Sequence, residues 1–342
     1  MKEIKQINSF YLIIMLSTII FGSIFSNIIP KGSLVISQLV FLLIPATLFI
    51  KQKKLNLKES FSLKKFNPIN LPLILFLTIL MQYPLAAVSQ LSAYIFGDQL
   101  AFIFDDVVSR SSFSVLFLSL ALLPAICEEI FFRGLIFNRY KNRVSMKTLI
   151  VMNSLLFAIF HLNIQQFSYA FLFGIVVSLV VYLTDSIYPA MIMHFFSNFL
   201  SVIEMKFPNS YFSILDYILP KGEGMFYVGM MIILSIFSSV VIYVVLVYMA
   251  KFNGRSMIEY GVFEQLESVS INFDETPKEN IIDSMKRFEA QQPIEVCDKK
   301  AEKIESKNRF LNIREVFSWH IGLSIFIFIV FSTLVVLASN IA

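Results

Sequence analysis

Long apolar stretches alternate with short polar connections along most of this chain. A helix needs about 20 residues to cross the hydrocarbon core of a bilayer, within a range of about 17–25. The two short stretches, 148–162 and 187–202, are expected to extend into their polar ends or to lie inside the protein. The pattern predicts an all-α, polytopic membrane helix bundle of about eight or nine spans. The nine apolar segments are 10–29, 34–50, 71–96, 112–137, 148–162, 167–184, 187–202, 225–250 and 321–340.

The composition also indicates a membrane protein. Apolar residues make up 57% of the 342 positions and charged residues only 15%, whereas soluble domains carry about a quarter charged residues. The net charge of +4 is small, and the basic residues cluster beside apolar segments, so no nucleic-acid partner is expected. Cys127 lies in an apolar segment and Cys297 in a charged one, so neither a disulfide nor a cysteine nucleophile is expected.

Basic residues in the short connections set the expected orientation. They crowd the amino terminus and the connections at 51–70 and 138–147, whereas the connection at 98–110 has an acidic excess. We therefore expect a multi-pass protein of the cell membrane with its amino terminus, both basic connections and residues 251–318 in the cytosol. The loop at 98–110 and the carboxyl terminus are then outside.

Changes in composition divide the chain into five parts. The stretch 251–318 is predicted to be a charged cytosolic linker, mostly disordered, because residues 264–314 include few apolar ones. A small regulatory or partner-binding element is the alternative for this linker. The predicted parts are amino-terminal membrane spans at 1–110, core membrane spans at 111–205 that carry the motifs described below, an additional span at 206–250, the linker at 251–318 and a final span at 319–342.

Polar and charged residues inside three of the apolar segments carry the functional signal. A charged side chain near the bilayer centre costs roughly 2.5–3.5 kcal/mol on insertion scales, so it needs a partner, a cavity or a function. Two of the three histidines of the chain belong to this set. Glu128, Glu129 and Arg133 lie in segment 112–137, His161 ends segment 148–162, and His194 and Asn198 lie in segment 187–202.

The spacing of these residues predicts a catalytic centre. Glu129 and Arg133 are four residues apart, so they stack on one helix face and can neutralise each other. Glu128 is rotated by about 100° from Glu129 and is free to face a cavity. His194 and Asn198 also share one face. A carboxylate beside an imidazole can hold a water molecule and take its proton, and further donors can stabilise an oxyanion, which indicates water-mediated amide hydrolysis.

The three motifs Glu-Glu-x-x-x-Arg, Phe-x-x-x-His and His-x-x-x-Asn occur in this order, with Ser-Ile-Tyr-Pro-Ala before His194. In this they resemble the CPBP family of intramembrane endopeptidases, the CAAX-protease and bacteriocin-processing (Abi) family, over about residues 112–202. The resemblance implies glutamate-type hydrolysis of membrane-associated proteins or peptides. It implies the following roles: Glu128 is the base that activates water, His161 helps to hold that water, His194 and Asn198 stabilise the oxyanion, and Glu129 with Arg133 supports the geometry.

Two questions about the site stay open in the sequence. Glu128, His161 and His194 could form a catalytic set for a divalent metal such as Zn²⁺, but the His-Glu-x-x-His signature is absent, and we expect no cofactor. For the three segments to converge, the fifth must begin below the membrane surface or tilt, or the fourth must break near Gly134.

Two other classes of function compete with the endopeptidase. One is a non-proteolytic CPBP-type membrane regulator or immunity protein that binds a membrane partner. The other is a secondary transporter that couples transport to its buried carboxylates. A transporter with inverted repeats tends to have matching broken spans in its two halves, and this chain has no such pair.

Overall fold

The computed structural model describes residues 2–28, 33–208, 224–255, 311 and 313–341. Every regular element in these ranges is a helix, which confirms the predicted all-α membrane bundle. The elements, with π-helical segments written η, are α1 (Lys2–Ile28), α2 (Ser33–Ser37), η1 (Gln38–Leu43), α3 (Ile44–Gln52), α4 (Leu57–Ser60), α5 (Asn70–Phe96), α6 (Gln99–Arg110), α7 (Phe113–Leu116), η2 (Phe117–Leu122), α8 (Leu123–Glu129), η3 (Ile130–Ile136), α9 (Phe137–Tyr140), α10 (Met146–Phe160), α11 (Ile164–Thr184), α12 (Tyr188–Lys206), α14 (Gly224–Phe252), α18 (Ile313–Val316) and α19 (Trp319–Ile341).

Each of the nine apolar segments coincides with a helix or a run of joined helices. Within the described residues, seven of these are long and apolar enough to cross a membrane. The other two are α10 and α12, which are the two segments expected to be short. Ten of the 15 residues of α10 are buried. This short helix therefore lies inside the protein, which is one of the two arrangements expected for it.

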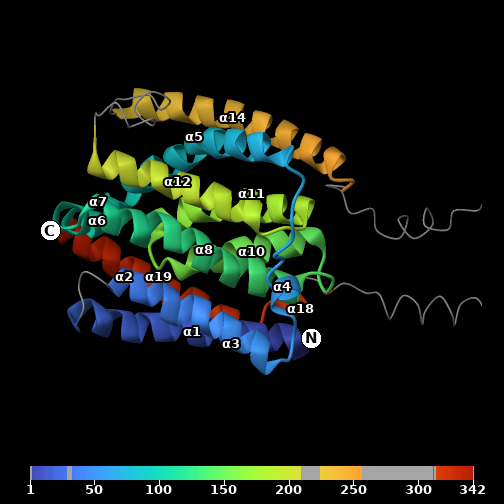
Figure 1. Cartoon of the computed structure of the whole chain (residues 1–342). Coiled ribbons are helices and arrows are strands. Elements are labelled where there is room, and N and C mark those ends of the chain that lie inside the picture. Colours follow the sequence, from blue (N-terminus) through green and yellow to red (C-terminus); the bar gives the residue numbers. More distant parts are fainter. Residues whose placement is uncertain (1, 29–32, 209–223, 256–310, 312, 342) are drawn as a thin grey trace, which may run out of the picture. The chain divides into compact units, whose positions relative to one another are not determined.

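The central helices pack around the run from α7 to α9. Helix α12 contacts η2, α8, α5 and α11, and α10 contacts α11 and η3. Gly174 on α11 allows a close approach to α10, because a Cβ there would lie 3.0 Å from the Cβ of Ser154. Figure 1 shows α14 running along α5 and α19 running beside α1. The outer helices therefore cover a core built from α5, α8, α10, α11 and α12.

The connection at 98–110 is a helix, α6, rather than the expected loop. Asp98 caps it, because its Oδ1 accepts a hydrogen bond from the Ala101 amide at 3.1 Å. Asp106 and Arg110 form an i,i+4 ion pair at 2.6 Å. A cap and such a pair both favour a short helix, and two of the three acidic residues of this connection make these contacts.

The fourth segment does not break near Gly134. It continues from Phe113 to Tyr140 through two π-helical segments, η2 and η3. Gly134 instead allows α4 to come close, because a Cβ at this position would lie 3.0 Å from Cδ1 and 3.3 Å from Cα of Phe61. Convergence of the polar residues is thus achieved without a break in this helix.

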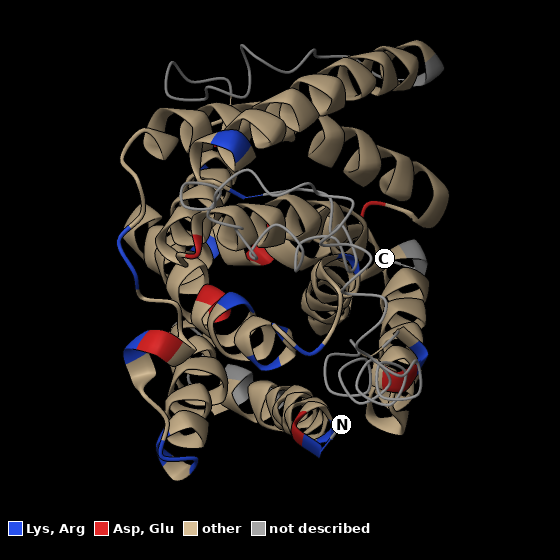
Figure 2. Cartoon of the chain, turned by 90° about the vertical axis from the view of Figure 1, so that its right-hand side faces the viewer, with Lys and Arg blue, Asp and Glu red and all other residues tan. Residues whose placement is uncertain are grey.

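The basic connections meet at one end of the bundle, as expected. Glu3 near the amino terminus pairs with Arg143 and lies 3.9 Å from Arg139. Figure 2 looks onto this end, where blue and red stretches of ribbon lie near the amino terminus. The structure brings these segments together, whereas their placement in the cytosol stays a prediction.

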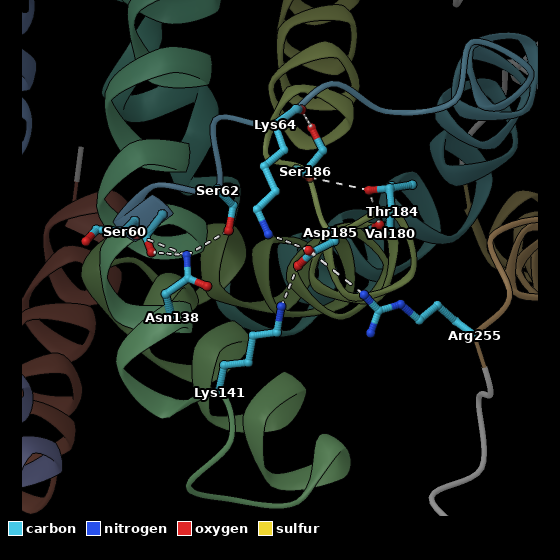
Figure 3. A network of polar contacts seen from close by, with 11 residues as sticks. Ser60, Ser62, Lys64, Asn138, Lys141, Val180, Thr184, Asp185, Ser186 and Arg255 are labelled. Carbon is cyan, nitrogen blue, oxygen red and sulfur yellow. Dashed lines mark hydrogen bonds and ion pairs between the residues drawn. The ribbon is translucent and has the colours of Figure 1, made fainter. Parts of the chain in front are cut away.

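Asp185 joins three cationic side chains at this same end (Figure 3). Its carboxylate lies 2.6 Å from Lys64, 2.5 Å from Lys141 and 4.0 Å from Arg255. Partial burial raises the pKa of Asp185, but hydrogen bonds and charges from Lys141 and Lys64 outweigh it and hold the pKa below its ordinary value of 3.8. Asp185 therefore ties the connections at 51–70 and 138–147 and the end of α14 to the turn between α11 and α12.

Most of the predicted linker at 251–318 lies outside the described residues, apart from 251–255, 311 and 313–318. The described residues within 1–257 and 312–342 form one compact unit. The five-part division of the chain and the disorder of the linker stay predictions.

Candidate active site

Glu128 and Glu129 end α8, between the two π-helical segments η2 and η3. Single π-helical turns inside α-helices occur frequently at functional sites. Pro124 in α8 has no amide hydrogen, so it cannot bond the carbonyl of Leu120 four residues earlier. Asn198 of α12 donates to that carbonyl through Nδ2 at 2.9 Å. The irregular helix that carries the carboxylates is thus fixed by a side chain from a neighbouring helix.

A second amide fixes the other irregular turn. Asn153 on α10 donates to the carbonyl of Phe132 in η3 at 2.8 Å, and Ser178 on α11 donates to Asn153 Oδ1 at 3.1 Å. Both polar contacts are buried. A buried backbone carbonyl needs such a partner, so these two helices hold η3 in place.

Glu129 lies at the centre of a fully buried ionic cluster. Its Oε1 accepts hydrogen bonds from Arg133 Nη1 at 2.9 Å and from His194 Nδ1 at 2.7 Å. The side chains of Glu129 and Arg133 have no exposed area, and that of His194 is 5% exposed. The predicted stacking of Glu129 and Arg133 is confirmed. The contact with His194 adds a second cluster member from α12.

Glu128 points in a different direction and meets different partners. Its Oε1 accepts a hydrogen bond from Gln38 Nε2, the first residue of η1, at 2.9 Å. Its Oε2 lies 4.0 Å from His194 Nε2. That separation is too long for a direct hydrogen bond and suits a bridging water molecule. Glu128 is therefore held through one oxygen and presents the other toward His194.

His161 follows α10 as its C-cap residue and is fixed from one side. Its Nδ1 contacts the carbonyl of Phe157 at 2.9 Å. Since a carbonyl only accepts hydrogen bonds, Nδ1 carries a proton, and in the neutral ring Nε2 is then an acceptor. The ring centroid lies 4.9 Å from that of Phe157, whose ring centroid lies 5.9 Å from that of His194. His161 and His194 thus lie around the same Phe157 ring, and the role of His161 in holding water stays a prediction.

Phe157 is a site residue that the sequence reasoning did not single out. Its ring lies 4.9 Å from the ring of His161 and 5.9 Å from that of His194. The guanidinium carbon of Arg133 lies 4.1 Å from the ring centroid, a cation–π distance. Phe157 is the first residue of the Phe-x-x-x-His motif, which could have indicated its place beside the histidine.

Gln38 is the second residue that sequence reasoning missed. Gln38 is a polar residue within the apolar segment 34–50, and this departure from the apolar pattern could have marked it as a candidate site residue. Gln38 and Glu128 are 90 positions apart, so only the packing of η1 against α8 brings them together.

Among the described residues, no group of three or more His, Cys, Asp or Glu side chains is arranged to hold a metal ion. The hydrogen bonds to Gln38, Glu129 and the Phe157 carbonyl use Glu128 Oε1, His194 Nδ1 and His161 Nδ1, and they do not involve Glu128 Oε2 or Nε2 of either histidine. Cys127 is buried and unpaired by disulfide. The expectation that the protein needs no cofactor stays a prediction.

The fold and these contacts define a multi-pass membrane protein with a buried glutamate and histidine centre. Residues 110–200 match a family model described as type II CAAX prenyl endopeptidase Rce1-like. This match confirms the resemblance to the CAAX protease (CPBP) family that the three motifs carry. Neither the curated proteins nor the solved structures yield a match to this chain. Gln38 lies outside the matched residues.

Proposed function

We propose that this protein is an intramembrane endopeptidase that hydrolyses peptide bonds of membrane-associated proteins or peptides. The observation that carries the proposal is the facing pair of Glu128 Oε2 and His194 Nε2, 4.0 Å apart. Each is held from behind by a separate partner, Gln38 for Glu128 and Glu129 for His194. This pair lies within the segment that matches the CAAX protease family.

Glu128 is the base in the proposed reaction. A water molecule between the facing atoms can donate to Glu128 Oε2 with a normal hydrogen bond of about 2.8 Å. His161 Nε2 is an acceptor and helps to orient the same water. As Glu128 takes the proton, the water oxygen attacks the carbonyl carbon of the substrate. The tetrahedral intermediate then collapses, and Glu128 returns the proton to the leaving nitrogen.

His194 stabilises the oxyanion in this proposal. Because Nδ1 donates to Glu129, a hydrogen on Nε2 requires the imidazolium form. In that form the charges of Glu128, Glu129, Arg133 and His194 sum to zero. A preorganised donor of this kind acts strongly in a site from which water is excluded. Asn198 has one amide hydrogen beyond the bond to Leu120 and sits one turn from His194, so it can add a second donor.

The test begins with the membrane peptides of cells that carry either the wild-type protein or Glu128→Gln. Peptides that accumulate only with the variant are candidate substrates, and their cleavage is then measured with purified, reconstituted protein. We expect Glu128→Gln and His194→Ala each to lower turnover on the order of 10²–10³-fold or more. Cleavage in ¹⁸O-labelled water should place one ¹⁸O in the new carboxylate.

Glu59→Gln is the matched control, because it makes the same change at an exposed glutamate of α4. This variant should cleave like the wild type. Near-wild-type turnover by Glu128→Gln, with the protein folded in the membrane, would contradict the assigned base. If no peptide differs between the two cell types, the binding role of a non-proteolytic regulator is favoured instead.

A further inference from the structure

A groove of about 680 Å³ lies on the surface between α1 and α3, away from the carboxylate centre. Three exposed lysines, Lys2, Lys5 and Lys53, line it together with the polar side chains of Gln6 and Ser9. Pockets of about 300–1,000 Å³ are typical of small-molecule sites. The groove is therefore large enough to take a ligand head group.

The positive charge of this groove is uncompensated. Glu3 is the sole acidic residue among the first 58 positions, and its carboxylate is engaged by Arg143 and lies near Arg139. Within the part of the chain that the structure describes, no carboxylate pairs with Lys2, Lys5 or Lys53. The side chain of Lys53 is positioned by a hydrogen bond from Nζ to Gln6 Oε1 at 3.1 Å. An anion is the ligand that such a lining favours.

The lower part of the groove is apolar and runs along α1. Phe10 and Phe49 pack with ring centroids 4.6 Å apart, and Ile13 is 56% exposed. From Lys2 to Ile13 the helix rises about 16 Å at 1.5 Å per residue. Both helices are candidate membrane spans, so the groove begins at the charged helix ends and continues toward the hydrocarbon region. A charged head joined to acyl chains has this same order of polarity.

From this juxtaposition we propose that the groove between α1 and α3 binds one anionic phospholipid. The phosphate contacts Lys2, Lys5 and Lys53, and the hydroxyl of Ser9 and the amide of Gln6 supply further polar contacts. The first acyl carbons lie on Phe10, Phe49 and Ile13. The continuous apolar floor favours a lipid over a soluble phosphate ester.

The proposal is tested with the full chain purified in an uncharged detergent. It is titrated with phosphatidylglycerol or with phosphatidylcholine of the same acyl chains, and bound lipids are counted by native mass spectrometry. We expect one saturable phosphatidylglycerol per chain and markedly weaker binding of phosphatidylcholine. Each lysine near the surface contributes about fivefold in affinity, the equivalent of about 1 kcal/mol. Replacing Lys2, Lys5 and Lys53 with Gln should then weaken binding on the order of 100-fold.

The matched control replaces three other exposed lysines at the same end, Lys51, Lys58 and Lys65, with Gln. It removes the same charge outside the groove and should change the affinity by less than about twofold. If the triple variant does not fold, the single variant Lys5→Gln is used instead, and its affinity for phosphatidylglycerol should fall about fivefold. An equal loss in the control, equal binding of the two lipids, or competition by glycerol phosphate as tight as by phosphatidylglycerol would each overturn the lipid site.

Discussion

Replacing Gln38 with Met tests whether the orientation of Glu128 governs the reaction. Gln38 Nε2 donates to Glu128 Oε1 at 2.9 Å, while Oε2 faces His194. Methionine keeps the length of the unbranched side chain but has no N–H donor. The substitution therefore removes the hydrogen bond with little change in volume.

The expected magnitude follows from the charge and burial of the pair. A hydrogen bond to a charged group contributes about 1.5–3 kcal/mol to stability. The side chain of Glu128 is 12% exposed, so water replaces the lost donor only in part. We expect kcat to fall about 10- to 100-fold, which corresponds to about 1.4–2.7 kcal/mol. KM should change little, because the proposed role of Gln38 is to orient the base.

The assay measures initial rates with reconstituted protein over a range of substrate concentrations. Thr47→Val is the control. Thr47 lies in α3, is half-buried like Gln38, and donates a hydrogen bond to the carbonyl of Leu43 at the end of η1. Thr47→Val should keep kcat within about twofold, since a local hydrogen bond is removed far from the site. An unchanged kcat for Gln38→Met, or an equal fall for Thr47→Val, would refute the orienting role.

Three further measurements address stability, topology and metal dependence. Asp185→Asn is the chosen variant because asparagine tolerates the φ of 51° at this position. It should lower the Tm by a few degrees at pH 7. The reason is that the pKa of Asp185 is lower in the folded state, so the ionised carboxylate stabilises the fold. This difference should be complete above the ordinary pKa of 3.8 and vanish as the pH falls through the lower folded-state value; equal differences at pH 7 and pH 3 would contradict it. Cysteine labelling should find residues 51–65, 138–147 and 255–315 on the cytosolic side and 98–110 outside, and an external signal at 255–315 would overturn the orientation. Proteolysis should survive thorough chelation, whereas loss of activity that added metal restores, together with near-stoichiometric bound metal, would establish a metal enzyme.

The sequence predicted the contacts that depend on helical spacing and missed those that depend on packing. Glu129 and Arg133 form the expected pair because residues four apart share a helix face. The hydrogen bond from His194 to Glu129 joins two residues that are 65 positions apart in the sequence. The two side chains meet only because α12 packs against α8. Asn198 was expected to face the reaction centre, and its main observed contact is the Leu120 carbonyl. Its predicted role as an oxyanion donor stays untested.

The apolar pattern located the membrane helices but not the polar detail between them. All nine predicted segments correspond to helices, because length and hydropathy dominate their formation in a bilayer. The π-helical turns do not follow from hydropathy. Pro124 was a readable signal for one of them, since a proline inside a helix frees the carbonyl four residues earlier. Helix α6 was missed because its acidic residues were assigned to a loop rather than to a cap and an ion pair.

Adjacent glutamates acquire different chemistry here because successive helical residues point about 100° apart. Glu129 turns into the core and receives two donors, Arg133 and His194, so its charge is matched and its position is fixed. Glu128 turns toward His194 Nε2 and receives one neutral donor, Gln38. A neutral amide orients Oε1 without adding a second positive charge to that of the proposed His194 imidazolium, and a further cation would oppose the uptake of a proton still more. A glutamine at position 38 is therefore suited to a carboxylate that must accept a proton from water and give it up again.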